Sequence, residues 1–167
     1  MVYQAREDSS MPFFRDRLTK ILDESGWKPS IYQPAAFLGG PPVGWRIEIG
    51  PAEFVYRVPE ESQDTLIVVL IRRLEQRSGL RSSMAAFVYF LSLVKASNCG
   101  IRWIIGCVEP TSDRPADSLA AKRIAAFYLG YLKSWMISEP NREGWIRGDL
   151  STFVPPVGRT DFVPKPK

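Results

Sequence analysis

The chain has 167 residues, 45% of them hydrophobic and 24% charged, which is typical of a globular protein that folds around one core. The 22 Lys and Arg residues only slightly outnumber the 18 Asp and Glu residues, so the formal net charge is +4 and argues against nucleic acid as a partner. The absence of histidine excludes Ser-His-Asp hydrolases, Cys-His proteases and histidine-ligated zinc, and we expect no metal site.

The sequence predicts neither secretion nor a membrane span. Residues 1–10 lack the apolar stretch of a signal peptide. The longest apolar run, 66–71, is far shorter than the ~20 residues that a membrane-spanning helix needs. Cys99 and Cys107 are too few for a disulfide framework and are expected to be buried thiols. We therefore expect a soluble, cytoplasmic protein.

The N-terminal quarter predicts one helix and an irregular segment. Residues 1–10 are polar and are expected to be disordered. Pro12 suits the first turn of a helix, and apolar residues at helical spacing predict that this helix runs from about 11 to 25. Gly26 fits its end. The Pro- and Gly-rich stretch 27–44 contains large apolar residues, so we expect it to be ordered and packed.

Three strands follow. Apolar and polar residues alternate over 45–49 and again over 54–58, and the intervening Gly50-Pro51 predicts a hairpin. The continuous apolar run 66–71 is typical of a strand that is buried on both faces at the centre of a sheet.

The remaining elements alternate between helix and strand. An apolar face from Met84 to Val94 predicts a helix capped by Ser82 or Ser83 and ended by 98–100. Residues 101–108 predict a strand, parallel to 66–75 because a helix connects the two. A last helix is predicted by apolar and aromatic residues at helical spacing: Ile124, Phe127, Tyr128, Tyr131, Leu132 and Trp135. Its aromatic stripe is expected to pack in the core, or else to form a groove for a partner.

The element order predicts an α+β fold, in which helices pack on a mixed, mainly antiparallel sheet with one parallel crossover. A short strand is expected at 145–146. Residues 11–153 are expected to form a single domain, and 154–167 a proline-rich tail that is extended or disordered.

The loop after the central strand is the main candidate site. A loop that opens a helix presents free N–H groups and a positive dipole end, which suits an anion or a docking partner. A solvated turn, with Gly79 in an unusual conformation, remains the alternative, and the charges of 72–77 would then pair with neighbours across the sheet. The candidate residues are Arg73, Glu75, Gln76, Arg77, Gly79, Arg81 and Ser82.

This strand, loop and helix resemble the acyl-CoA-binding core of the GCN5-related N-acetyltransferases, over about 45–135. Gln76 and Gly79 match that family's loop, Arg81 stands where it has a small residue, and Phe127-Tyr128 matches its helical Phe-Tyr. The resemblance implies an acetyltransferase-like core with acetyl-CoA as cofactor. Glu48 or Glu75 would then be the general base, and Tyr128 the acid that protonates the leaving thiolate.

A second resemblance is closer in residues and covers about 30–130. The stretches 44–49 (GWRIEI) and 72–80 (RRLEQRSGL), with Ala85-Ala86, Arg123 and Phe127-Tyr128, are similar to the LcrR family of bacterial type III secretion systems. It implies a cytoplasmic regulator or accessory protein with no cofactor, whose partners are other secretion proteins. The N-terminal helix and the tail are expected to lie outside this likeness.

Three hypotheses therefore remain open at this point. The first is a non-enzymatic secretion regulator that acts by protein–protein interaction through the 72–81 loop and exposed aromatic residues. The second is a CoA-dependent N-acyltransferase, active or degenerate. The third is a dimerising scaffold, which would make the protein a homodimer.

Overall fold

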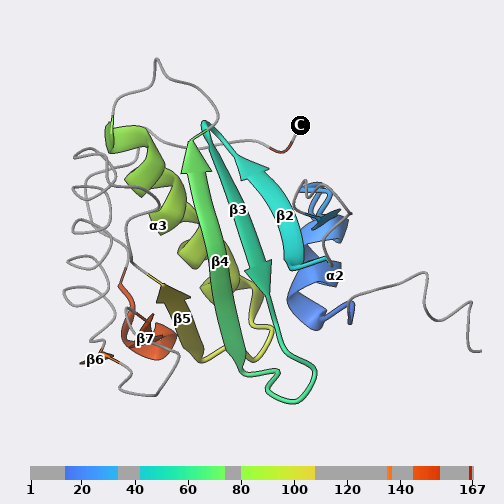
Figure 1. Cartoon of the computed structure of the whole chain (residues 1–167), viewed down its shortest axis with the longest axis vertical. Coiled ribbons are helices and arrows are strands. Elements are labelled where there is room, and N and C mark those ends of the chain that lie inside the picture. The colour runs from blue at the N-terminus through green and yellow to red at the C-terminus, as the bar shows by residue number, and fades with distance from the viewer. Residues whose placement is uncertain are drawn as a thin grey trace, which may run out of the picture.

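A computed structural model describes residues 14–33, 42–73, 80–107, 135–136, 145–154 and 166 of the chain, with the backbone alone at 73, 80–84, 107 and 135–136. In this part of the chain one sheet packs against two helices (Figure 1). The expected α+β fold is confirmed. The strands are β1 (Ser30–Tyr32), β2 (Gly44–Ile49), β3 (Ala52–Arg57), β4 (Thr65–Arg73), β5 (Trp103–Cys107), β6 (Trp135–Met136) and β7 (Trp145–Asp149).

The strands follow the order β1-β2-β3-β4-β5-β7-β6, which places β4 at the centre as predicted. The β2–β3 hairpin turns at Gly50-Pro51, where Gly50 adopts a positive φ of 56°. Only β4 and β5 pair in parallel among the described strands, and helix α3 (Leu80–Ser97) connects them. The predicted crossover is therefore confirmed.

The first helix is shorter than predicted. Helix α2 spans Arg17–Glu24, and residues 14–16 are not helical, so the start inferred from Pro12 was wrong. Asp16 is the N-cap because its carboxylate accepts a 2.8 Å hydrogen bond from the Thr19 amide. The predicted end at Gly26 is confirmed: the Gly26 and Trp27 amides donate to the carbonyls of Asp23 and Leu22, which is a Schellman motif.

Replacing Asp16 with alanine is expected to lower the free energy of unfolding by about 2 kcal/mol, at the upper end for an N-cap. The reason is that Asp16 is buried and also accepts a 2.7 Å bond from the Thr19 hydroxyl. Urea denaturation will measure the loss. Asp16→Asn, which keeps one acceptor, should cost less than Asp16→Ala; equal losses would contradict the capping role.

Helix α3 crosses behind β4 and β3 in the view of Figure 1. It begins at Leu80, so Ser82 and Ser83 lie inside the helix, and the prediction that one of them caps it was wrong. Its end is confirmed, since Asn98 and Gly100 adopt positive φ angles of 51° and 89°.

Aromatic rings form the centre of the core between α3 and the sheet. Phe90 stacks on Phe54 at a centroid distance of 5.0 Å and contacts Tyr56 at 5.7 Å, and Phe87 stacks on Phe54 at 6.2 Å. All four side chains are buried. The Tyr56 hydroxyl lies 2.9 Å from the Thr19 hydroxyl, which ties α2 to β3, and burial raises the pKa of Tyr56.

The C-terminal part adds two strands to the far edge of the sheet. β7 extends over five residues, so the short strand expected at 145–146 is confirmed and is longer than predicted. Trp135 pairs with Arg147 as part of β6, so the prediction that Trp135 continues the last helix was wrong. The rest of that predicted helix, 124–134, lies outside the described residues, as do 1–10, 74–79 and most of the tail.

One strand was not predicted. β1 pairs antiparallel with the start of β2 inside the segment that the sequence indicated only as ordered. Trp27, which precedes it, is buried and contacts Tyr89 of α3 edge to face at 6.1 Å. Neither of the helices described here is long and apolar enough to cross a membrane.

Candidate functional site

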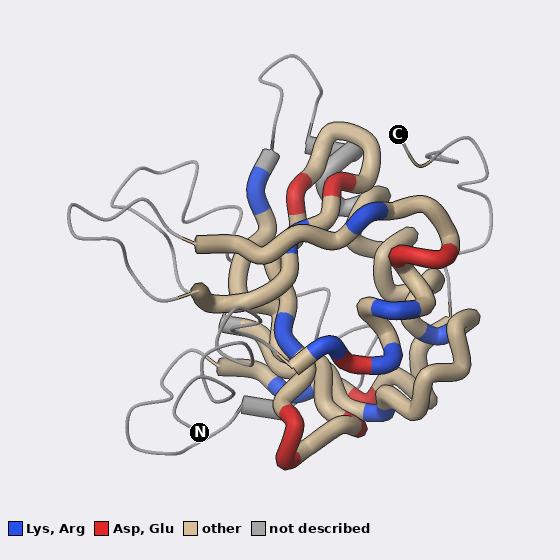
Figure 2. The backbone as a smooth tube through the Cα atoms, turned by 90° about the vertical axis from the view of Figure 1, so that its right-hand side faces the viewer, with Lys and Arg blue, Asp and Glu red and all other residues tan. Residues whose placement is uncertain are grey.

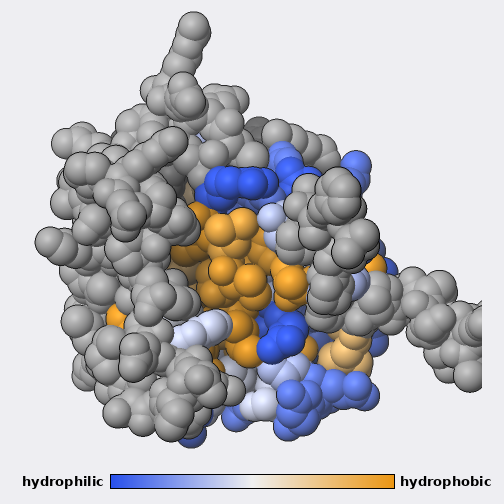
Figure 3. All heavy atoms as spheres, viewed as in Figure 1, coloured by the Kyte–Doolittle hydropathy of each residue, from blue (hydrophilic) through white to orange (hydrophobic). Residues whose placement is uncertain are grey.

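The sheet has a second face, opposite α3, that carries an apolar surface. Residues paired directly across strands share a face, and the register places Val55, Ile67, Leu70 and Ile105 on this side. Together with Val69, which is exposed between them, they form what we call the outer aliphatic patch. Figure 3 shows hydrophobic atoms exposed over β3 and β4, with hydrophilic atoms above and below them. Val55 is fully buried, Val69 is 39% exposed, and the other three are intermediate. The prediction that 66–71 is buried on both faces was therefore wrong.

A β-bulge shapes this patch. The register passes from Val55–Leu70 to Tyr56–Val68, so Val69 has no partner on β3. Val68 and Ile71 both pack toward the core, and the extra residue between them interrupts the alternation. Val69 and Leu70 are therefore consecutive residues that both turn outward.

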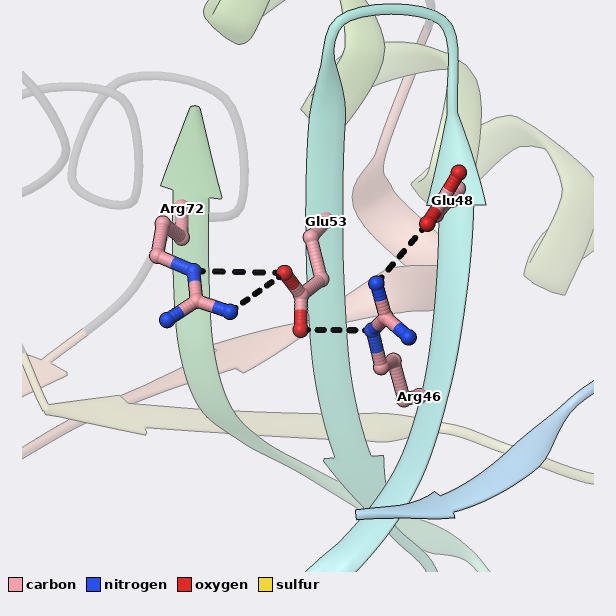
Figure 4. Close-up of polar contacts among 4 residues, drawn as sticks. All are labelled: Arg46, Glu48, Glu53 and Arg72. Atoms are coloured by element: carbon pink, nitrogen blue, oxygen red, sulfur yellow. Dashed lines mark hydrogen bonds and ion pairs between the residues drawn. The ribbon is translucent and has the colours of Figure 1, made fainter. Parts of the chain in front are cut away.

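A set of charged residues, which we call the charge ladder, lies beyond the patch, where β3 begins and β4 ends (Figure 4). Its centre is Glu53, whose side chain has no exposure. The Glu53 carboxylate accepts bonds of 2.7 Å from Arg46 Nε and of 3.2 and 2.7 Å from Arg72 Nε and Nη2. Arg46 also donates to Glu48 at 2.8 Å. The predicted cross-strand pairing of the Arg72 charge is confirmed, and hydrogen bonding to Glu53 raises the pKa of Arg72.

The arginines of this ladder remain accessible while the central carboxylate does not. The Arg72 side chain is 52% exposed and that of Arg46 is 36% exposed. Acidic and basic residues are interspersed along the described backbone (Figure 2). In the charge ladder, Glu53 is buried whereas Arg46, Arg72 and Glu48 are partly exposed, so the exposed charge at this end of the patch is mainly positive.

A second set of cations lies near Trp103 on β5. The guanidinium groups of Arg102 and Arg147 lie 4.6 Å and 4.2 Å from the Trp103 ring centroid, within range of cation–π attraction. Asp149 is opposite Trp103 on β7 and lies 3.8 Å from Arg102. A hydrogen bond from Ser151 is the main cause that lowers the pKa of Asp149, and Arg102 contributes less.

Comparison with known proteins gives one match. The family described as "Type III secretion system regulator (LcrR)" matches residues 15–156 of the 167. The chain belongs to the LcrR family. Neither the curated proteins nor the solved structures contain a match to it.

The LcrR match is wider than the likeness inferred from the sequence. It includes α2 and extends past the short 3-10 helix Leu150–Thr152, so the expectation that the N-terminal helix lies outside the family was wrong. The whole described sheet and both helices fall inside the matched range. The outer aliphatic patch and the charge ladder are thus part of the LcrR region of the chain.

The residues predicted as a site are only partly placed. Arg73 ends β4, and Arg81 and Ser82 lie in the first turn of α3, so the loop does connect the central strand to a helix. Glu48 is half-buried and bound to Arg46. Glu75, Gln76, Arg77, Gly79 and Tyr128 lie outside the described residues, and their predicted roles remain predictions.

Sequence reasoning missed Glu53 and Val69. Glu53 stands in a run of buried residues, Ala52 to Tyr56. A carboxylate in such a run needs partners, so its position in the sequence was the signal that could have indicated a buried ion pair. Val69 gave no signal, because a bulge inside a continuous apolar run leaves the residue types unchanged.

Binding of a cofactor or metal by the described residues would need a hollow or a set of ligand side chains. A hollow of about 170 Å³ at the β1–β2 end of the sheet is lined by Trp27, Lys28, Ser30, Arg46, Ile47 and Glu48. It is smaller than the roughly 300 Å³ at which ligand pockets begin. No group of three Cys, Asp or Glu side chains within the described ranges is placed to hold a metal ion.

Proposed function

We propose that this LcrR-family protein regulates type III secretion in the bacterial cytoplasm by binding another protein of the secretion system through the outer aliphatic patch. The observation that carries the proposal is the exposure of Val69 at the bulge of the central strand, beside Leu70 and Ile67.

The composition of this surface supports protein binding. Interfaces between proteins combine an apolar centre with a polar rim, and arginine is enriched in them. The outer aliphatic patch supplies the centre, and Arg46, Arg57 and Arg72 supply cations around it. Membership of the LcrR family indicates the process in which the protein acts, since the family is described as a type III secretion system regulator.

Replacing Val69 with glutamate is expected to abolish regulation, because a charge at the centre of the patch must be desolvated on binding. A strain that lacks the gene is complemented with each variant, and the amount of secreted protein is measured. Val69→Glu should secrete like the deletion strain. Val154→Glu is the matched control, since Val154 is 68% exposed and lies outside the patch. A folded Val69→Glu protein that complements fully would remove the patch from the mechanism.

A second candidate function is CoA-dependent N-acyl transfer, and one observation favours it. Pairing of β4 with β5 covers Thr65 to Val68 only, so among the described strands 69–73 extend beyond β5. Backbone groups there could bind an extended ligand. The loop that would hold the CoA diphosphate, 76–81, is described only from residue 80 onward.

Acetyl-CoA at 1 mM is expected to leave the melting temperature unchanged if the protein is a non-enzymatic regulator. A site with a dissociation constant near 10 µM would instead stabilise the fold by about 2.7 kcal/mol at this hundredfold excess. Differential scanning fluorimetry measures the difference, with 3′,5′-ADP as the control for non-specific nucleotide binding. A shift specific to acetyl-CoA would favour the acyltransferase.

A further inference from the structure

We propose that the segment bound by the outer aliphatic patch is acidic and amphipathic, with apolar side chains at its centre and carboxylates toward both ends. This inference rests on the proposed function, since it presumes that the patch binds a protein. It adds the chemistry of the partner, which neither the family description nor the exposure of Val69 specifies.

Charge on the outer face carries the inference. Among the described residues, five arginines and four carboxylates lie on or beside this face: Arg46, Arg57, Arg72, Arg102 and Arg147 against Glu48, Glu53, Asp64 and Asp149. The side chains of Glu48, Glu53 and Asp149 are 31%, 0% and 16% exposed, and Asp64 is exposed. Arg72 and Arg102 are 52% and 60% exposed. A partner therefore meets more exposed arginine than exposed carboxylate on this face, because Glu53 and Asp149 are buried or nearly so.

The positions of two arginines give the partner a length scale. Arg57 pairs with Ile67 at one end of the patch, and Arg72 lies five residues farther along β4. Five residues of strand span about 17 Å. Two carboxylates of the partner lie this far apart when they are separated by about five residues in an extended segment or by about eleven residues in a helix.

Two other occupants fit this face less well. Single-stranded nucleic acid needs many cations along the surface that binds it, whereas the net charge of this chain is only +4, even though Trp103 shares the outer face. A second copy of this chain in a two-fold arrangement would bring its own exposed arginines toward the same surface. An acidic protein segment satisfies both the aliphatic centre and the cations.

Site-specific photocrosslinking tests the inference in the bacterium during type III secretion. The full-length chain carries a photoreactive residue at position 69, and crosslinked peptides are identified by mass spectrometry. We expect one segment of a secretion protein with net negative charge and apolar residues at its centre. Position 17 is the control, since Arg17 is exposed on α2 at the other side of the sheet.

Charge reversal at Arg57 supplies the second measurement. Arg57 is exposed and makes no ion pair with the described residues, so Arg57→Glu should fold normally. Lost attraction and new repulsion together should lower the crosslink yield at position 69 about tenfold. Arg17→Glu makes the same charge change on α2 and should leave the yield within about twofold.

The outcomes separate the two proposals. No crosslink at position 69 would overturn the proposed function and the inference together. A crosslink to a basic or neutral segment would overturn the inference alone, as would an unchanged yield for Arg57→Glu. A crosslink to nucleic acid, to lipid or to a second copy of this chain would overturn both in favour of that occupant.

Discussion

Replacing Phe90 with alanine is expected to lower the free energy of unfolding by about 4 kcal/mol, within the range for a fully buried phenylalanine. Phe90 has no exposed surface and packs between α3 and the sheet, with ring contacts to both Phe54 and Tyr56. Truncation removes those contacts and leaves a cavity that the two neighbouring rings cannot fill by small shifts. Equilibrium unfolding in urea, followed by tryptophan fluorescence, measures the loss.

If the alanine variant is too unstable to purify, Phe90→Leu provides a folded variant to measure. It should lose clearly less stability than Phe90→Ala, because most of the apolar volume remains. Leu93→Ala on the same helix is the control, since Leu93 is only partly buried. A loss at Phe90→Ala no larger than at Leu93→Ala would contradict the central place of this ring in the core.

Removing both arginines from the charge ladder is expected to cost about 3 kcal/mol, at the lower end for breaking a buried ion pair. In the Arg46→Ala, Arg72→Ala double variant, the Glu53 carboxylate remains inside the sheet without its ion-pair partners. The direct loss of Coulomb attraction is smaller, because both arginine side chains are more than one-third exposed and are screened by water.

Adding Glu53→Gln to the double variant separates these two contributions. A neutral amide needs no counter-charge, so the triple variant should recover more than half of the lost stability. Urea denaturation of the wild type, the double variant and the triple variant completes the comparison. A triple variant that is no more stable than the double variant would show that the unpaired Glu53 carboxylate does not cause the loss of stability.

The strands and their connections were predictable because each depends on local pattern. Alternation on either side of Gly50-Pro51 required a hairpin, and a helix between two apolar strands required a parallel crossover. Errors arose where two local signals competed. Pro12 suits the first turn of a helix, but the carboxylate of Asp16 satisfies the exposed amides better and fixes the start.

Non-local pairing explains the remaining errors. Trp135 fits the helical spacing of the residues before it, but its backbone pairs with Arg147 in β6. Strand β1 has three residues, too few for a pattern, and exists because β2 offers it an edge.

The candidate site was likewise predictable where it depends on local pattern and not where it depends on pairing between strands. The sequence indicated the charged end of β4, and Arg72 is part of the charge ladder. It could not indicate Glu53 as the centre, because the two arginines that bind this residue come from different strands. Nor could it indicate the outer aliphatic patch, because the apolar run 66–71 reads the same with or without a bulge.

The extra residue in β4 has a consequence for how the family can diverge. Core alternation is regular on both sides of Val69, so this position can change identity while the packing against α3 stays the same. Under the proposed function, a single substitution at this position would therefore change the binding of a partner while the fold is kept, and related regulators that bind different partners should differ first at this position.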